Sequence, residues 1–183
     1  MPEVNRGRGD VLVKLETERM EMFALNREQL QLCLIDPLQL GKDLEVEIAP
    51  EVFSDESRQA IGIKTTRMLL VDPSLHPWYT YFLLVRKSDR RAMGVCGFKG
   101  GPSPHGSVEL GYAIHEDYRN QGFMTEAVRA LVVWAFEHEE CQRVMAETLR
   151  DNFASQRVLQ KAGLSFDRGL ENMLYWVQEK PQN

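Results

Sequence analysis

Alternating apolar and polar positions divide this chain into seven short segments that are typical of β-strands. These segments are rich in aliphatic, aromatic and β-branched residues and are bounded by turn-forming residues. They are residues 20–24, 79–85, 92–99, 107–114, 144–149, 165–170 and 173–177. A charged turn over residues 87–91 joins the second and third segments, so we expect them to form an antiparallel hairpin. The last two segments predict a second hairpin.

Two helices are predicted between the first and second strands. Asn26 and Gln29 have the spacing of a capping box, and Pro37 interrupts the helix that they start. The second helix begins near Ser54 and ends before Pro73. Its apolar positions are Ile61, Ile63, Met68 and Leu69.

Two further helices flank the fifth strand, at about residues 122–139 and 153–162, and Gly163 ends the second of them. The order is therefore strand, two helices, three strands, helix, strand, helix and two strands. That order is specific for few α/β (α+β) folds with a mixed sheet. At 183 residues we expect a single domain over 1–183, with residues 1–10 as a flexible arm.

Charge and hydropathy exclude several classes of partner. A net charge of −5 argues against a broad surface for polyphosphates, so we expect no nucleic acid partner. No apolar run is long enough to span a bilayer, and the first ten residues lack the apolar core of a signal peptide. Any anionic ligand must therefore be bound by a few individual groups and not by a broad basic surface.

The spacing of cysteines and histidines predicts neither disulfides nor a metal site. Cys33, Cys96 and Cys141 lie far apart and form no paired motif, which favours a reducing, cytoplasmic location and a role as core residues. No two histidines have the spacing that places both on one helix face for a metal. The histidines are His76, His105, His115 and His138.

An acidic stretch between the first two helices has two interpretations. Its carboxylates most simply form a solvated surface, and they would attract a cationic acceptor if they line a cleft. They are Glu45, Glu47, Glu51, Asp55 and Glu56.

The most informative segment is residues 118–127, which lies between a strand and an amphipathic helix. A helix N-terminus has unpaired amides and a positive dipole end, both of which attract phosphate. Gly122 allows close approach of the backbone and Arg119 adds positive charge. Apolar residues that hold this helix against the sheet are Phe123, Ala127, Leu131 and Trp134. A single glycine also fits an ordinary strand-to-helix turn.

Other phosphate-binding motifs are missing. The dinucleotide-binding pattern G-x-G-x-x-G does not occur, and neither does the G-K-[ST] of a Walker P-loop. The segment Arg119-Asn120-Gln121-Gly122-Phe123-Met124 instead resembles the R/Q-x-x-G-x-G/A turn of the GCN5-related N-acetyltransferase (GNAT) family. Met124 stands where that family has Gly or Ala.

A second segment extends this resemblance. Asn152-Phe153-Ala154-Ser155, followed by residues 158–164, is similar to the family signature in which Asn and Ser open a helix beside the coenzyme. Residues 15–20, 126–127, 134–136 and 146–148 look like the branch of ribosomal-protein N-terminal acetyltransferases of the RimJ and RimL type. The similarity covers most of the chain and is strongest over residues 95–164.

The resemblance implies the GNAT fold: a mostly antiparallel mixed sheet with helices on both faces and a splay between the fourth and fifth strands. Acetyl-CoA is then the cosubstrate, with its pantetheine arm in the splay. The implied cofactor-binding residues are Tyr112, Ala113, Ile114, Arg119, Asn120, Gln121, Gly122, Phe123, Met124, Thr125, Asn152 and Ser155.

The chemistry implied is direct attack of an amine on the thioester. Glu109 resembles the position of the general base in many relatives, although strand glutamates are often only exposed spacers. A backbone NH of residues 112–114 is the natural donor to the developing oxyanion. Many relatives supply a tyrosine acid where this chain has Leu159, so Ser155 is the expected hydrogen-bond donor to sulfur, with a first-turn structural role as the alternative.

The predicted activity is acetyl transfer to a primary amine, either a protein N-terminus or a small molecule. The alternatives are a non-catalytic acetyl-CoA-binding or interaction module, and an acyltransferase for another acyl-CoA. A homodimer is possible, and Trp78 is a candidate for an exposed apolar side chain at an interface.

Overall fold

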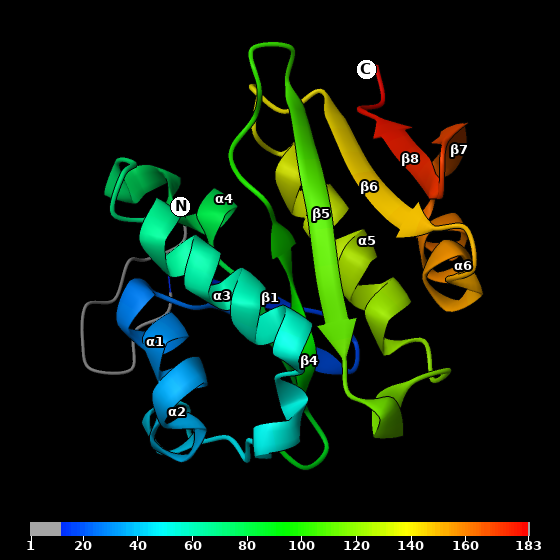
Figure 1. Ribbon diagram of the computed structural model, residues 1–183. Coiled ribbons are helices and arrows are strands. Elements are labelled where there is room, and N and C mark those ends of the chain that lie inside the picture. The colour runs from blue at the N-terminus through cyan, green and yellow to red at the C-terminus, as the bar shows by residue number, and fades with distance from the viewer. Residues whose placement is uncertain (1–11, 183) are drawn as a thin grey trace.

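The computed structural model describes residues 12–182, and in that range one mixed sheet of eight strands runs through the molecule (Figure 1). The predicted arm, residues 1–10, lies outside the described residues. The strands are β1 Val13–Glu16, β2 Met20–Ala24, β3 Phe82–Arg86, β4 Arg91–Phe98, β5 Ser107–Ile114, β6 Arg143–Leu149, β7 Ser165–Leu170 and β8 Met173–Glu179.

Their order across the sheet is β1-β2-β3-β4-β5-β6-β8-β7, and all neighbours are antiparallel except the parallel pair β5 and β6. All seven predicted strands are present, but the second begins at Phe82 and not at Tyr79, because Tyr79 ends a short helix, α4 (His76–Tyr79), that was not predicted. β1 is an additional edge strand that was not predicted, because its four residues, Val-Lys-Leu-Glu, carry only a weak strand signal.

The helices are α1 Arg27–Ile35, α2 Pro37–Leu44, α3 Asp55–Arg67, α4 His76–Tyr79, α5 Phe123–Phe136 and α6 Phe153–Ala162. The predicted capping box of α1 is confirmed, since Asn26 Oδ1 accepts from the Gln29 amide at 2.8 Å and Gln29 Oε1 accepts from the Asn26 amide at 2.9 Å. Pro37 ends α1 as predicted, but it also begins α2, which was not predicted. Proline suits the first helical position, where its missing NH needs no partner.

The sheet separates two hydrophobic cores. Figure 1 shows α1 and α3 on one face and α5 and α6 on the other. Leu131 and Val144 are buried on the side of α5, whereas Leu30 and Leu83 are buried on the side of α1 and α3. All three cysteines are buried free thiols, as expected of core residues. Within residues 12–182, no helix has the length and apolar character needed to cross a membrane.

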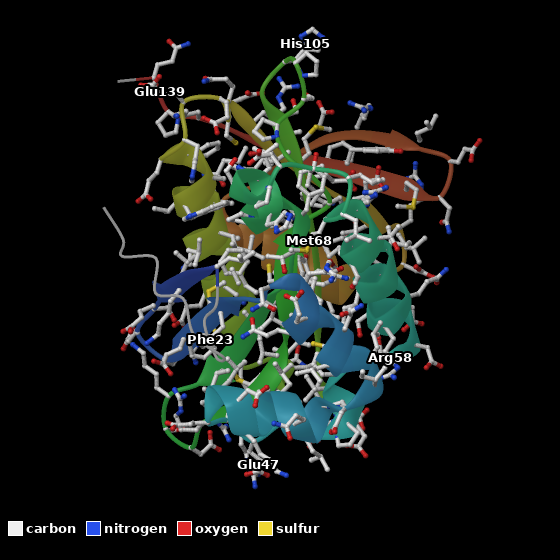
Figure 2. The ribbon with its side chains drawn as sticks, turned by 90° about the vertical axis from the view of Figure 1, so that its left-hand side faces the viewer. Phe23, Glu47, Arg58, Met68, His105 and Glu139 are labelled. Atoms are coloured by element: carbon white, nitrogen blue, oxygen red, sulfur yellow. The ribbon has the colours of Figure 1, made fainter. Side chains whose placement is uncertain are left out.

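The apolar positions of the second predicted helix differ in burial, and the expectation for Trp78 is wrong. Ile61 and Met68, the latter labelled in Figure 2, are buried, but Ile63 and Leu69 are 48% and 64% exposed. Ile63 lies off the helix face that carries Ile61, and Leu69 follows the end of α3 at Arg67. Trp78 is not an exposed interface residue, since it is only 3% exposed. Its ring lies 4.6 Å from that of Trp134 and 5.1 Å from that of Phe98, in the core beside α5.

Lys64 is an unusual feature of the core between α3 and the sheet. Only 5% of this residue is exposed. Its ammonium donates to the Phe98 carbonyl and lies 4.4 Å from the centre of the Tyr81 ring. Burial, with the nearby charge of Arg67 as a smaller cause, lowers the pKa of Lys64 to about 7.

We expect Lys64→Met to remove a pH-dependent component of stability. The unfolded chain has the ordinary lysine pKa of about 10.4. Between about pH 7 and pH 10 the unfolded state therefore binds more protons than the folded state, and this lysine makes stability rise with pH. Each unit between the two pKa values contributes about 1.4 kcal/mol. Urea unfolding at pH 7, 8 and 9 should show that the free energy of unfolding of the wild type increases relative to that of the variant as the pH rises. A constant difference between the two proteins would contradict the assignment.

Candidate active site

A gap opens in the middle of the sheet between β5 and β6. The two strands pair only from Ser107 to Leu110 and from Arg143 to Ala146, and beyond those residues they separate. Figure 1 shows them diverging toward the end of the sheet where α5 begins. The predicted splay between the fourth and fifth predicted strands is thus confirmed. The backbone of residues 111–114 has no partner from β6, which leaves its groups on that side available to a ligand.

The turn before α5 forms an anion-binding N-terminus. Gly122 is the N-cap with a φ of 83°, a left-handed conformation that favours glycine, and no side chain caps the helix. The amides of Phe123, Met124 and Thr125 therefore have no partner within the helix. Together with the helix dipole they attract a negative group. Asn120 is also left-handed, with a φ of 59°, so the turn curves sharply before the helix.

Arg19 braces this turn from the segment between β1 and β2. Its guanidinium donates to the Gln121 carbonyl at 2.9 Å and to the Glu126 carboxylate at 2.7 Å, and it lies 4.3 Å from the centre of the Phe123 ring. Burial alone would raise the pKa of Glu126, but hydrogen bonds from Thr17 and Arg19 outweigh it and lower that pKa. Arg19 was not predicted as a site residue, because a contact between residues so far apart in the chain leaves no local pattern in the sequence.

A pocket of about 1120 Å³ connects this turn with the splay and the start of α6. Most of the cofactor-binding residues that the resemblance implied line it. They are Tyr112, Ala113, Ile114, Arg119, Asn120, Gly122, Phe123, Met124, Thr125, Asn152 and Ser155. Gln121 does not line the pocket; its side chain donates to the Asp117 carbonyl at 2.6 Å. Glu109 also lies outside the lining.

The two residues that depart from the family pattern, Met124 and Leu159, both pack into the hydrophobic core. Met124 is 4% exposed and belongs to the hydrophobic core beside α5, so its side chain does not close the mouth of the helix. Leu159 is fully buried in the same core. The helix position at which many relatives have a tyrosine is therefore a packing position in this chain.

The start of α6 presents a hydroxyl to the pocket. Asn152 caps the helix by accepting from the Ser155 amide at 3.1 Å. The Ser155 hydroxyl lies 2.7 Å from the phenol oxygen of Tyr112, which reaches it from β5. The two hydroxyls thus meet where β5 and α6 face each other across the gap.

Glu109 lies on the other face of β5 from its buried neighbours Val108 and Leu110. Its carboxylate is ion-paired with Lys99, and Lys99 also lies 3.7 Å from the Glu147 carboxylate on β6. The Glu109 side chain is 32% exposed, so a water or an amine can reach it from the α3 side of the sheet.

The pocket has basic and acidic parts that the motifs did not include. The basic side chains on α5 and α6 are Arg129, Arg157 and Lys161. Arg157 and Lys161 are four residues apart on one helix, a spacing that the sequence itself displays. Of the acidic stretch, Glu51 and Glu56 line the pocket, whereas Glu47 pairs with Arg91 at 3.0 Å. Among residues 12–182, no three side chains of His, Cys, Asp or Glu gather as a metal site would require.

This fold and pocket define an acetyltransferase of the GNAT class. The family model described as "Acetyltransferase (GNAT) domain" matches residues 38–165, and the chain belongs to that family. Among its relatives is YjdG of Bacillus subtilis (strain 168), described as an uncharacterized N-acetyltransferase. The two are 27% identical over 166 residues, which cover 91% of this chain and 98% of YjdG. The uncharacterized N-acetyltransferase p20 of Bacillus licheniformis is 29% identical over 84% of this chain and 85% of its own length.

Solved structures share the fold at low sequence identity. One is RimL, a ribosomal L7/L12 α-N-protein acetyltransferase, with a TM-score of 0.64 and 17% identity over 96% of this chain and 98% of RimL. Another is the ribosomal-protein-S5-alanine acetyltransferase of Vibrio fischeri, with a TM-score of 0.63 and 17% identity over 92% of this chain and 97% of that protein. The chain is therefore an N-acetyltransferase whose fold resembles that of the ribosomal-protein branch.

Proposed function

We propose that this protein transfers the acetyl group of acetyl-CoA directly to a primary amine in a ternary complex. The observation that carries the proposal is the opening of the sheet between β5 and β6 beside the uncapped N-terminus of α5, within one pocket. A RimL structure of the same fold has been determined in complex with coenzyme A.

The residues present fit the coenzyme. The amides of Phe123, Met124 and Thr125, with Arg119 beside them, would hold the pyrophosphate. The unpaired edge of β5 at residues 112–114 would bind the amide groups of the pantetheine arm as an added strand does. The basic side chains of Arg157 and Lys161 would attract the remaining phosphate group.

The reaction needs a neutral amine. At pH 7 a lysine-type amine, with a pKa of about 10.4, is neutral in less than one molecule in a thousand, whereas a peptide α-amino group, with a pKa of about 7.7–8.0, is neutral in roughly a tenth. We assign the role of proton acceptor to Glu109, directly or through water, and the exposure of its carboxylate on the α3 side of the sheet supports this assignment. A covalent cysteine intermediate is disfavoured, because burial raises the pKa of Cys33 to about 12 and that of Cys96 still further.

The acceptor is a cationic amine, either a protein N-terminus or a small molecule. Glu51 and Glu56 on the pocket wall support this class, since their charge favours an approaching ammonium group.

The buried free thiols suit a reducing compartment, so we place the reaction in the cytoplasm.

Calorimetry and thiol release test this function. We expect acetyl-CoA to bind and free CoA thiol to appear when alkyl amines or peptides with a free N-terminus are added. Binding without release over a broad amine panel would favour a non-catalytic binding module. Release only from longer acyl-CoA thioesters would indicate a different acyl donor.

We expect Glu109→Gln to lower kcat/KM for an alkyl amine about a hundredfold or more, the usual contribution of a general base. The loss should be smaller for a peptide α-amino group, which is already partly neutral. Glu147→Gln is the matched control, because it also removes a carboxylate near Lys99 from the same sheet face. Turnover by Glu109→Gln that equals wild type at every pH would remove Glu109 from the mechanism.

A further inference from the structure

Two hydroxyl groups from separate elements meet at the gap in the sheet. The Tyr112 phenol oxygen lies 2.7 Å from Ser155 Oγ and 3.3 Å from the Ser155 carbonyl oxygen. Tyr112 belongs to β5, two residues beyond the last residue paired with β6, and Ser155 lies in the first turn of α6. Both residues line the pocket. The contact therefore joins two elements, β5 and α6, that line the pocket in which the pantetheine arm would lie.

We propose that Tyr112 positions the hydroxyl of Ser155, the residue that the family resemblance makes the expected hydrogen-bond donor to the leaving CoA thiolate. Ser155 donates a hydrogen bond to sulfur, and Tyr112 is a positioning residue that donates to Ser155 Oγ and so directs the serine hydrogen toward the sulfur. This inference rests on the proposed function, and it assigns to Tyr112 a side-chain role beyond the backbone contact expected of β5.

The phenol has one hydrogen and two acceptors within reach, Ser155 Oγ at 2.7 Å and the Ser155 carbonyl oxygen at 3.3 Å, and the shorter contact is the one that the proposal uses. The Ser155 amide is already bonded to Asn152, so the helix cap does not need the Ser155 hydroxyl. A hydroxyl has one hydrogen and two acceptor positions, so Ser155 Oγ can accept from Tyr112 and donate elsewhere at the same time. Leu159, which occupies the position of the usual tyrosine, is buried in the core and cannot supply this hydrogen.

The pair works by hydrogen bonding, without ionisation of either hydroxyl. Burial raises the pKa of Tyr112 well above its ordinary value, although its hydrogen bond to Ser155 acts in the opposite sense. A neutral phenol that cannot easily lose its proton remains a donor throughout the reaction. Chained hydrogen bonds strengthen one another in a low-dielectric site, so the phenol increases the donor strength of the serine.

The step balances without another reactant. The amine nitrogen forms a bond to the carbonyl carbon, the C–S bond breaks, and its electron pair remains on sulfur. The proton lost by the amine passes to Glu109 or to water. The thiolate accepts the Ser155 hydrogen bond and then takes a proton from solvent as CoA leaves.

The test is the acidity of the thiol of bound CoA, followed by the ultraviolet absorbance of the thiolate as the pH is raised. In wild type we expect the pKa of the bound thiol to lie below the value for free CoA. In Tyr112→Phe and in Ser155→Ala it should rise by about one to two pH units, the difference made by one hydrogen bond to a charged group. The kcat for acetyl transfer should fall about ten- to a hundredfold with little change in KM for acetyl-CoA.

The double variant distinguishes a coupled pair from two independent effects. If Tyr112 acts through Ser155, Tyr112→Phe should have little further effect in the Ser155→Ala protein. Tyr79→Phe is the matched control, because it makes the same chemical change at a residue outside the pocket. It should leave both the thiol titration and kcat as in wild type.

Two outcomes would overturn the proposal. One is an unchanged thiol titration in the Tyr112 variant with a higher KM for acetyl-CoA, which would make the contact only a brace across the gap. The other is additive losses in the double variant. The titration needs bound CoA but no known acceptor. A wild-type protein that binds CoA and acetylates no amine would therefore refute the proposed function and still report on the hydroxyl pair.

Discussion

Thr125→Pro should weaken acetyl-CoA binding about ten- to a hundredfold, because it deletes one of the three amides at the mouth of α5 that would hold the pyrophosphate. A hydrogen bond to a charged group contributes about 1.5–3 kcal/mol, so removing a single NH is enough for this loss. The helix itself should persist, since proline is tolerated in the first turn, where the amide has no partner within the helix. Calorimetry with acetyl-CoA measures the change.

The matched control is Thr125→Ala, which removes the same side chain and keeps the amide. We expect its affinity for acetyl-CoA to stay within a few-fold of wild type and its thermal unfolding to be similar to that of the proline variant. Equal binding by the proline and alanine proteins would show that the amide of residue 125 does not contact the coenzyme, and would count against the pyrophosphate site at this helix.

Trp134→Ala should be the most destabilising of the proposed substitutions, at about 3–5 kcal/mol. Trp134 is 8% exposed, and its ring packs 4.6 Å from that of Trp78 and 5.9 Å from that of Phe98, between α5 and the sheet. Truncation leaves a cavity that these rings cannot fill. For a protein of this size, the midpoint of thermal unfolding should fall by roughly 10 °C or more.

The neighbouring residue provides the control. Val133 precedes Trp134 in the same helix and is 62% exposed, so Val133→Ala should change the free energy of unfolding by no more than about 0.5 kcal/mol. Comparable shifts of the unfolding midpoint in the two variants would contradict the assignment of Trp134 to the core. Because α5 also carries the turn that faces the pocket, we expect Trp134→Ala to weaken acetyl-CoA binding as well.

Local sequence signals were sufficient for most elements. The capping box at Asn26 and the glycine at residue 163 mark helix ends through contacts within a few residues, and both lie where the structure has such ends. α2 was missed because Pro37 was interpreted only as a break, although proline also favours the first position of a new helix. Trp78 was misplaced because composition does not show which apolar side chains the tertiary fold covers.

The residues of the candidate site also fall into two groups: those that local sequence identifies and those that only long-range contacts bring into the site. The turn at Gly122 and the cap at Asn152 could be identified from residues that are adjacent in the chain. Arg19 could not, because it reaches Glu126 across 107 positions of sequence. The same holds for Lys99, whose pairing with Glu109 depends on the register of β4 against β5. A single sequence contains the residue types for such contacts but not their pairing.

The sequence by itself determined the order of the main elements, the helix N-terminus suited to phosphate and the family, because each depends on neighbouring residues or on motifs of fixed spacing. Only the tertiary structure decided that Met124 and Leu159 pack into the core, that Glu51 and Glu56 line the pocket, and that the hydroxyls of Tyr112 and Ser155 meet. Those outcomes depend on which elements the sheet brings side by side. The pairing of β5 with β6 is a long-range contact that stops at Leu110, and the opening beyond that residue forms part of the pocket.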